Sequence, residues 1–220
     1  MKKLLKITLT LLSILLIVLL STPYGLYYYG LSKVKIDRET IAVPQLNYKD
    51  DIYITYWITE SNTNDMKMTP YSPYNPILEC FDKEIPESFS IASIVARILV
   101  DPREIKFEKK LYRRIALNSM TIWVSQNLTI KQAMDSIFNK AYYGKGYNSL
   151  NKASLGYFNK KVNDLNIYEI LTLHIIPFAP SYYSKNKKAH LERLNHYIDK
   201  LKRLYPQKYH YLEEKMELEF

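Results

Sequence analysis

Residues 139–183 read NKAYYGKGYNSLNKASLGYFNKKVNDLNIYEILTLHIIPFAPSYY, and this stretch holds three of the 5 glycines in the 220-residue chain. Gly144 and Gly146 bracket a lysine directly after a pair of tyrosines. Because glycine adopts backbone conformations that other residues avoid, the pattern predicts a tight turn close to packed helices. Glu169 follows Asn166 by three residues, which is the pattern of a helix N-terminal capping box. The stretch therefore predicts helices joined by a glycine turn.

The chain on both sides of this stretch carries apolar residues at helical spacing, which predicts a mainly α domain. Residues 51–60, DIYITYWITE, are β-branched and aromatic, and they fit either a strand or a buried helix. Residues 61–76 contain three prolines and no period, which predicts a loop. A loop of this length is either functional or mobile, and whether it is a lid is left open. The positions that carry the helical pattern include Ile91, Val95, Leu111, Ile115, Ile130, Met134, Leu191 and Leu194.

The N-terminus predicts a membrane anchor. Three lysines precede an almost unbroken apolar run from Ile7 to Leu20, and tyrosines follow up to Tyr29. This length suits a helix of about 20 residues across the hydrocarbon, with tyrosines at the far interface. A cleaved signal peptide is the alternative, but LLSTPYG offers a poor small-x-small cleavage site. Lysines before the helix predict a single-pass protein of the cytoplasmic (inner) membrane whose body lies outside the cytoplasm.

These features predict four parts: an anchor over residues 1–30, a stalk over 31–50, a folded domain over 51–205 and an acidic tail over 206–220. The net charge of +9 suggests an anionic partner such as phosphate, phospholipid or an acidic polymer, although scattered lysines also serve solubility. A body outside the cytoplasm makes nucleic acid an unlikely partner. A single cysteine, Cys80, excludes an intrachain disulfide.

Several common catalytic motifs are absent from the sequence. The GKG segment lacks the upstream glycine and following Ser or Thr of a phosphate-binding loop. His190 and His196 are six residues apart, which does not place two metal ligands on one helix face. His174 lies in an apolar helical pattern and is interpreted as a packed core histidine. No metal site is predicted from the residues.

The quoted stretch resembles the peptidoglycan glycosyltransferases of family 51, membrane-anchored enzymes that polymerise lipid II. The family has an Asn-x-x-Tyr-Phe-Gly-x-Gly turn, a helix ending in Tyr-Phe-Gly-Lys, a Leu-x-x-x-Glu helix and a Leu-Pro-x-Ala-Pro-Ser segment. LERLNHYID near the C-terminus resembles the closing Arg-Arg-Asn-x-Val-Leu helix. The matching residues are Asn139, Tyr142, Tyr143, Gly144, Gly146, Tyr157, Phe158, Lys160, Leu165, Glu169, Pro177, Ala179, Pro180, Ser181, Arg193 and Asn195.

The resemblance implies a lysozyme-like helical domain behind a single transmembrane helix. It implies that Asn139, Gly144 and Gly146 form a structural turn beside the chemistry. The implied partners are lipid II or a glycan strand, the membrane, and other peptidoglycan synthases. No cofactor is expected apart from a divalent metal ion that the family resemblance permits.

The family's catalytic motifs are only partly present. Glu60 falls where the first motif has its catalytic glutamate, but Ser61 replaces the following aspartate and the histidine is missing. Counting back from Gly144 without gaps, Arg113 and Arg114 keep a basic pair, whereas Leu117 replaces the second glutamate. A leucine cannot accept a proton or hold a cation bound to pyrophosphate.

Three readings follow from this partial match. The leading one is a catalytically impaired relative in which Arg97, Arg113 and Arg114 hold the substrate pyrophosphate, because guanidinium groups pair well with phosphate oxygens. The second is an active, divergent transferase with Glu60 as its base. The third is a pure interaction scaffold.

Overall fold

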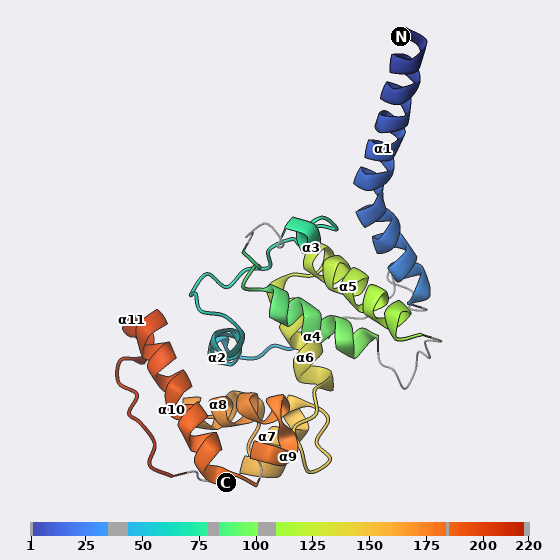
Figure 1. The fold of residues 1–220 in the computed structure, drawn as a ribbon. Helices are drawn as coiled ribbons and strands as arrows, with labels where there is room; N and C mark the ends of the chain where they lie inside the picture. Colours follow the sequence, from blue (N-terminus) through green and yellow to red (C-terminus); the bar gives the residue numbers. More distant parts are fainter. Residues whose placement is uncertain (1, 35–43, 79–83, 101–108, 184, 218–220) are drawn as a thin grey trace.

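The computed structural model describes residues 2–34, 44–78, 84–100, 109–183 and 185–217. Within these ranges the chain forms helices and no strand. Figure 1 shows a long N-terminal helix that projects from a compact group of shorter helices. The helices are α1 (Lys2–Lys33), α2 (Asp50–Glu60), α3 (Asn75–Leu78), α4 (Phe89–Leu99), α5 (Lys110–Asn127), α6 (Ile130–Lys140), α7 (Leu150–Phe158), η2 (Val162–Asp164), α8 (Ile167–Ile175), η3 (Ile176–Phe178), α9 (Pro180–Tyr183), α10 (Lys187–Leu204) and α11 (Pro206–Tyr209). The expected mainly α fold is confirmed.

Helix α1 is long and apolar enough to cross a membrane, with a mean hydropathy of 2.1 in its most apolar window. Most of its side chains are exposed, and only its C-terminal part packs against the domain. Tyr27 and Leu31 are buried there in a cluster with Met120 of α5. A Cβ atom on Gly30 would lie 2.7 Å from the carbonyl oxygen of Ile115, so only glycine permits this close crossing of α1 over α5.

The expected stalk, residues 31–50, has three parts in the structure. Residues 31–33 continue α1, residues 35–43 lie outside the described residues, and residues 44–49 run along the domain. The backbone N–H of Leu46 donates to Asp135, and that of Lys49 donates to Asn163 at 3.0 Å. The segment before α2 is therefore held against α6 and the turn after α7.

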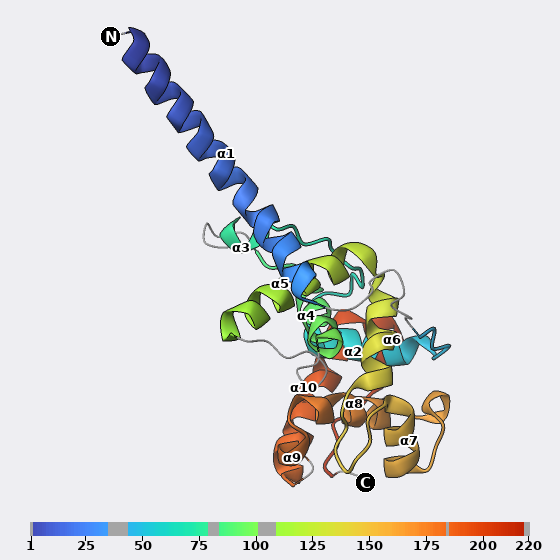
Figure 2. The same cartoon turned by 90° about the vertical axis from the view of Figure 1, so that its right-hand side faces the viewer.

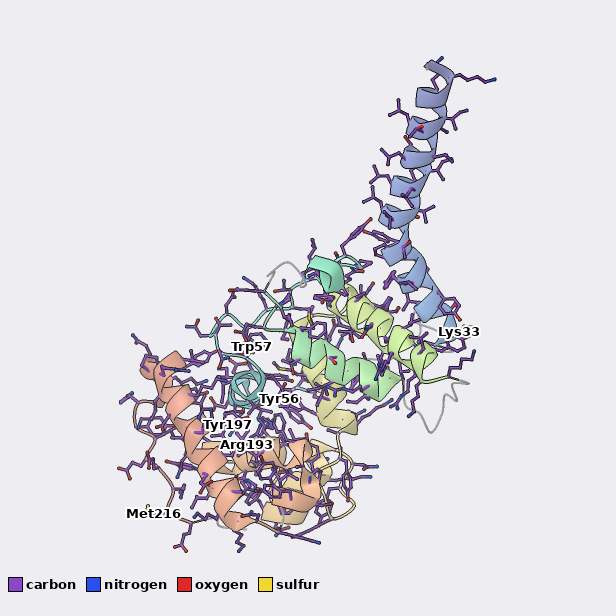
Figure 3. All side chains as sticks on the ribbon, in the orientation of Figure 1. Lys33, Tyr56, Trp57, Arg193, Tyr197 and Met216 are labelled. Atoms are coloured by element: carbon purple, nitrogen blue, oxygen red, sulfur yellow. The ribbon has the colours of Figure 1, made fainter. Side chains whose placement is uncertain are left out.

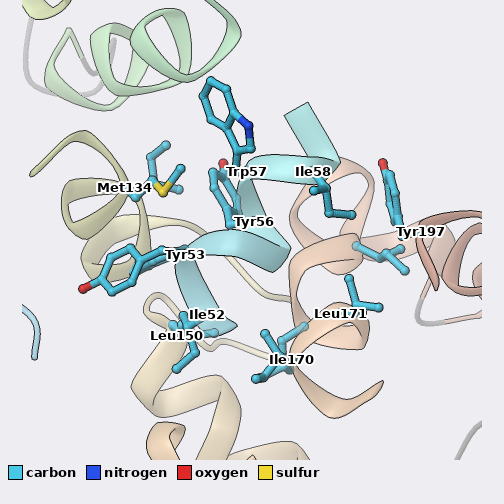
Figure 4. Close-up of a cluster of buried hydrophobic side chains, with 14 of the residues drawn as sticks. Ile52, Tyr53, Tyr56, Trp57, Ile58, Met134, Leu150, Ile170, Leu171 and Tyr197 are labelled. Atoms are coloured by element: carbon cyan, nitrogen blue, oxygen red, sulfur yellow. The ribbon is translucent and has the colours of Figure 1, made fainter. Parts of the chain in front are cut away.

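Residues 51–60 form a buried helix, α2, which decides between the two possibilities that the sequence left open. Asp50 and Asp51 occupy its first turn, where negative charge is favourable at a helix N-terminus. The helix packs against α6, α8 and α10 and is buried on nearly all sides, so tertiary burial outweighs the strand propensity of its residues. Figure 4 shows Trp57 and Tyr56 of α2 beside Met134, with Ile170 and Leu171 of α8 nearby.

The capping box expected at Asn166–Glu169 is present, and Thr129 and Gln132 form a second one at the start of α6. The glycine turn between α6 and α7 has positive φ at Gly144 (77°) and Gly146 (83°). A hydrogen bond of 2.7 Å closes the turn, from the backbone N–H of Tyr143 to the carbonyl oxygen of Tyr147. The expected tight turn is confirmed, and its backbone explains the glycines.

The described part of the expected acidic tail, residues 206–217, is held against the domain. A short helix, α11, covers Pro206–Tyr209, and a turn and a segment without regular secondary structure follow it. The Tyr209 hydroxyl donates to Asp51 at 2.6 Å. Asn195 of α10 exchanges two hydrogen bonds of 2.8 Å with the backbone of Lys215. These contacts satisfy the backbone N–H and C=O of Lys215 and tie the tail to α10 and α2.

Candidate functional site

A cavity of about 1180 Å³ lies where the C-terminal end of α2 meets α4, the end of α6, the start of α7 and the α8–α9 segment. Its wall combines polar and apolar side chains from parts of the sequence that are far apart. The lining residues are Tyr56, Glu60, Ser90, Ile94, Arg97, Ile98, Ile137, Asn139, Lys140, Ala141, Tyr142, Asn148, Ser149, Lys152, His174, Pro177, Phe178 and Pro180. Among these described lining residues, Glu60 is the only carboxylate.

Glu60 is the last residue of α2, which ends there because Ser61 is extended. The Ser90 hydroxyl, from the start of α4, donates to Oε2 of Glu60. The other oxygen, Oε1, is buried and has no hydrogen-bond partner among the described residues. Burial raises the pKa of Glu60, and this effect is opposed by the Ser90 hydrogen bond and by the charges of Arg193, Arg97 and Lys200. A carboxylate with a raised pKa and a free oxygen is suited to accept a proton or a hydrogen bond from a ligand.

Cationic side chains share the cavity with this carboxylate. Arg97 of α4 lines the same cavity, and Lys140 and Lys152 line it on the side of the glycine turn. Because the described lining residues include one carboxylate and three cationic side chains, the cavity favours an anionic ligand.

Arg193 of α10 stabilises the wall behind Glu60. Its guanidinium donates to the hydroxyl of Tyr183 at 2.7 Å and to that of Tyr197 at 2.9 Å, and it stacks 4.2 Å from the ring of Phe178, which lines the cavity. The Tyr197 hydroxyl in turn donates to the carbonyl oxygen of Thr59, next to Glu60. Figure 3 shows Arg193 and Tyr197 on α10, near Tyr56 of α2. This network holds α10 against the C-terminal end of α2.

The structure does not bring the two arginines of α5 into the cavity. Arg113 and Arg114 are exposed on α5 and are not among its lining residues. The N-terminal end of this helix lies beside the end of α1, where Lys33 stacks over Tyr112 (Figure 3). Leu117 packs against the apolar cluster between α1 and α5, so an apolar side chain suits its surroundings. The sequence placed Arg97, Arg113 and Arg114 together, and of these only Arg97 shares the cavity with Glu60.

The three turn residues have different positions. Asn139 lies at the end of α6, where it is exposed and lines the cavity. Gly144 lies in the turn, and a Cβ atom there would be 3.2 Å from the hydroxyl of Tyr157. Gly146 has open space around it. The close packing of the turn therefore depends on Gly144, while Asn139 is available to a ligand.

His174 is buried, as the sequence predicted for a core histidine. It stacks on Phe138 with ring centroids 5.5 Å apart, and its Nδ1 lies 3.3 Å from the Thr55 hydroxyl. Burial lowers its pKa to about 3, so the ring is neutral at physiological pH.

Sequence reasoning missed several residues of the site. Lys140 and Lys152 flank the glycine turn, and this position was the one local signal that could have placed them near the cavity. Arg193 matched a family motif, but nothing local indicated that it would contact Tyr183 and Tyr197.

A metal site does not form in the part of the chain that the structure describes. No group of three or more His, Cys, Asp or Glu side chains comes together there. The described residues thus hold no preformed set of three or more such ligands, and the divalent ion that the family resemblance permits stays a prediction that the chemistry below does not use.

The sequence model of a family described as Transglycosylase matches residues 90–202, which is more than half of the chain. The chain belongs to the transglycosylase family. The match covers α4 to α10 and includes Ser90, Arg97 and Arg193, whereas Glu60 lies before it. The structure, independently of this match, places Glu60 against Ser90.

Three curated relatives match shorter stretches. The chain is 26% identical over 98 residues to penicillin-binding protein 1A of Rickettsia bellii, a stretch that covers 44% of this chain and 12% of the relative. It is 32% identical over 77 residues to penicillin-binding protein 1F of Bacillus subtilis, covering 35% and 11%. It is 29% identical over 90 residues to penicillin-binding protein 1A of Rickettsia felis, covering 41% and 11%. The matched stretch thus spans only about an eighth or less of each relative.

Proposed function

We propose that this transglycosylase-family protein binds lipid II or a nascent glycan strand at the outer face of the cytoplasmic membrane, and that its capacity to polymerise glycan is impaired. The observation that carries the proposal is the cavity that Glu60 lines together with Arg97, Lys140 and Lys152. The family membership supports a peptidoglycan glycosyltransferase-like role, and α1 is suited to hold the domain at a membrane.

The cavity suits a large, anionic, glycosylated ligand. Its volume of about 1180 Å³ exceeds the roughly 300–1,000 Å³ typical of sites for small molecules. Arg97, Lys140 and Lys152 offer charge-assisted hydrogen bonds to a diphosphate. Asn139 and Asn148 add neutral donors and acceptors that suit sugar hydroxyls. Lipid II carries both of these chemical features.

Polymerisation needs more than this cavity offers. Transfer of the glycan requires a base for the attacking hydroxyl and stabilisation of the departing pyrophosphate. Glu60 is positioned as a base, but Leu117 stands where the resemblance places a second glutamate, and it packs in an apolar cluster. Loss of one general acid or base typically costs on the order of 10²–10⁴ in rate. We therefore expect this protein to retain ligand binding while its catalytic activity is impaired.

One observation favours an active, divergent transferase as a second candidate. Oε1 of Glu60 is buried without a partner among the described residues, and its pKa is raised. These are properties of a general base that operates near neutral pH. In this alternative, Glu60 would deprotonate the acceptor hydroxyl while Arg97 stabilises the leaving diphosphate.

The deciding experiment uses the full-length protein in lipid nanodiscs with fluorescent lipid II. Binding and glycan polymer are measured in the same samples for the wild type, Glu60→Gln, Arg97→Gln and Arg114→Gln. Hydrogen bonds to charged groups contribute about 1.5–3 kcal/mol, so Arg97→Gln should weaken binding roughly 10- to 100-fold. Arg114→Gln removes the same charge from an exposed position outside the cavity and should leave binding unchanged.

Each outcome of this experiment distinguishes the readings. Binding without polymer, with loss of affinity in Arg97→Gln alone, supports the proposal. Polymer that disappears in Glu60→Gln identifies an active transferase. Absence of both binding and polymer refutes the ligand-binding proposal and favours an interaction scaffold, such as one that binds a peptidoglycan synthase.

A further inference from the structure

One face of α10 presents three polar side chains to the end of α2. Arg193, Tyr197 and Lys200 follow one another at intervals of four and three residues, so they share one side of the helix. Figures 1 and 2 show α10 crossing the domain beside α8 and α2, with both of which it packs. The first two side chains form the wall behind Glu60. Lys200 therefore lies on the side of α10 that faces α2.

The contacts on either side of Lys200 show what it faces. Before it on α10, the Tyr197 hydroxyl donates, at 3.4 Å, to the carbonyl oxygen of the residue that precedes Glu60. After it, at the end of α10, the Tyr205 hydroxyl donates to the carbonyl oxygen of Asn64 at 3.1 Å. Lys200 lies between these two contacts along the helix, so it is level with Glu60 and the residues that follow it.

The ammonium group of Lys200 makes no hydrogen bond or ion pair with the residues that the structure describes. The residue exposes only 8% of its surface, and its Nζ lies 6.0 Å from the centre of the Tyr197 ring. The carboxylates whose charges act on it are Glu87 and Glu60. Glu87 is held beside the end of α2, because it accepts a hydrogen bond of 3.0 Å from the backbone N–H of Asn62. Lys200 thus interacts with two carboxylates through space and is bonded to neither.

The buried charge of Lys200 costs stability by itself. Burying an ammonium group without a bonded partner is unfavourable, and burial lowers the pKa of Lys200. A methionine would fill a similar space without this cost. Glu60 needs a cation nearby, because burial and the negative end of the α2 dipole both disfavour its charge. Burial raises the pKa of Glu60, and the charge of Lys200 acts in the opposite direction.

The three cations that act on Glu60 differ in what else they bind. They are Arg193, Arg97 and Lys200. The guanidinium of Arg193 donates to two tyrosine hydroxyls of the wall. Arg97 is exposed and lines the cavity, so an anionic ligand would pair with it. Lys200 is buried and is not a lining residue, so its charge stays available to Glu60 when a ligand is bound.

Further titratable groups surround Glu60 and Lys200, and they are neutral or exposed. Burial raises the pKa of Tyr56 and Tyr197 and lowers that of His174 to about 3, so these three groups are uncharged near neutral pH. The exposed groups, whose charges water screens, are Lys140, Lys152, Glu87 and Arg203.

We propose that Lys200 is a positioning residue of the ligand site, a buried cation that holds the carboxyl of Glu60 in its ionised form without bonding to it. The proposal rests on the proposed function, because an ionised Glu60 accepts a stronger hydrogen bond from a ligand hydroxyl than a protonated one does. The oxygen for this bond is Oε1, which has no partner among the described residues. Removal of the Lys200 charge then leaves the cavity intact but lets Glu60 take up a proton at a higher pH.

The first measurement is the titration of Glu60 in the full-length, ligand-free protein in detergent. Selective ¹³C labelling of the glutamate carboxyls follows the titration by NMR, and Glu60→Gln identifies the resonance of Glu60. The wild type is compared with Lys200→Met, Lys200→Arg and Lys202→Met. Lys202 is the matched control, because it carries the same charge on the same helix but lies two residues further on, nearly on the opposite side.

We expect the Glu60 midpoint to move to higher pH in Lys200→Met and to stay at the wild-type value in Lys200→Arg and Lys202→Met. An unchanged midpoint in Lys200→Met overturns the proposal. An equal rise in Lys202→Met also overturns it, because the effect would then come from net charge. Should Lys200→Met fail to fold, Lys200→Gln removes the charge but keeps a polar side chain, and an unchanged midpoint there refutes the proposal equally.

A second measurement separates positioning from a merely structural role. The affinity for fluorescent lipid II in nanodiscs is followed as a function of pH. Because binding uses the ionised carboxylate, affinity should rise with pH through the Glu60 midpoint, and Lys200→Met should shift this rise to higher pH. A loss of affinity by the same factor at every pH indicates a structural role and overturns the proposal. If the wild type binds no lipid II at any pH, the proposed function fails, whereas the titration of Glu60 in the ligand-free protein still decides the role of Lys200.

Discussion

The close crossing of α1 over α5 makes a specific prediction about two glycines of the same helix. A Cβ atom on Gly30 would overlap the side chain of Ser119 and lie 2.7 Å from the carbonyl oxygen of Ile115, whereas one on Gly25 would meet nothing within 4 Å. Gly30→Ala should therefore push the two helices apart. Gly25→Ala is the matched control, because it adds the same methyl group to the same helix without a contact.

The size of the effect follows from this difference. Both substitutions gain the roughly 1 kcal/mol by which alanine exceeds glycine in helix propensity, so that gain cancels in the comparison. Overpacking of a tight contact costs ~1–3 kcal/mol. In a chain of this size, each kcal/mol shifts the thermal midpoint by roughly 2–4 °C. Gly30→Ala should thus melt roughly 2–12 °C below Gly25→Ala.

The assay is thermal unfolding of the full-length protein in one detergent, followed by intrinsic fluorescence. A second readout is the distance between spin labels on α1 and α5, which should lengthen or broaden in Gly30→Ala only. Equal midpoints and equal distances for the two variants would refute the argument that this crossing depends on glycine. A higher midpoint for Gly30→Ala would refute it more strongly.

Three further predictions concern the domain itself. Gly144→Ala should lower the free energy of unfolding by about 1–2 kcal/mol, because φ is positive there. The loss should exceed that in Gly146→Ala, where the surroundings are open, and denaturant midpoints in the opposite order contradict this. Burial raises the pKa of Glu60 in the folded protein above that in the unfolded chain, so the folded state loses stability as the pH rises from the unfolded pKa to the folded one. Glu60→Gln should therefore melt above wild type at pH 8, and this advantage should vanish below pH 4. Burial lowers the pKa of His174 to about 3 and that of His190 to about 4. The contribution of the two neutral rings to the free energy of unfolding is therefore complete above about pH 6.5 and is lost as the pH falls. Each should add a slope of up to about 1.4 kcal/mol per pH unit between pH 6.5 and 4.5, and an unchanged slope in His174→Phe would argue against this account.

The candidate site could be read from the sequence only in part. Glu60 and Arg97 were singled out by motif position, and the structure places both in one cavity. Arg113 and Arg114 were singled out by the same reasoning, yet they are exposed on α5 outside the cavity. The motif spacing gave their place along the chain, but the packing of α5 against α1 places this part of the helix outside the cavity.

The local elements of this protein were determined by its sequence. Apolar residues at helical spacing, two capping boxes and a glycine turn depend on interactions within a few residues, so the sequence alone predicts them. The same holds for α1, because the apolar length of a helix is a property of consecutive residues. Residues 51–60 mark the limit, since their pattern fitted a strand or a helix until burial on nearly all sides made them α2.

Only the tertiary structure decided how these elements meet. It brought Glu60 to Ser90 across thirty residues, and it brought Tyr74 to Leu20 across fifty-four. It also set Arg193 behind the cavity, more than a hundred residues from Glu60 in the chain. Such contacts depend on the packing of whole helices against a shared core, and no local pattern records that packing.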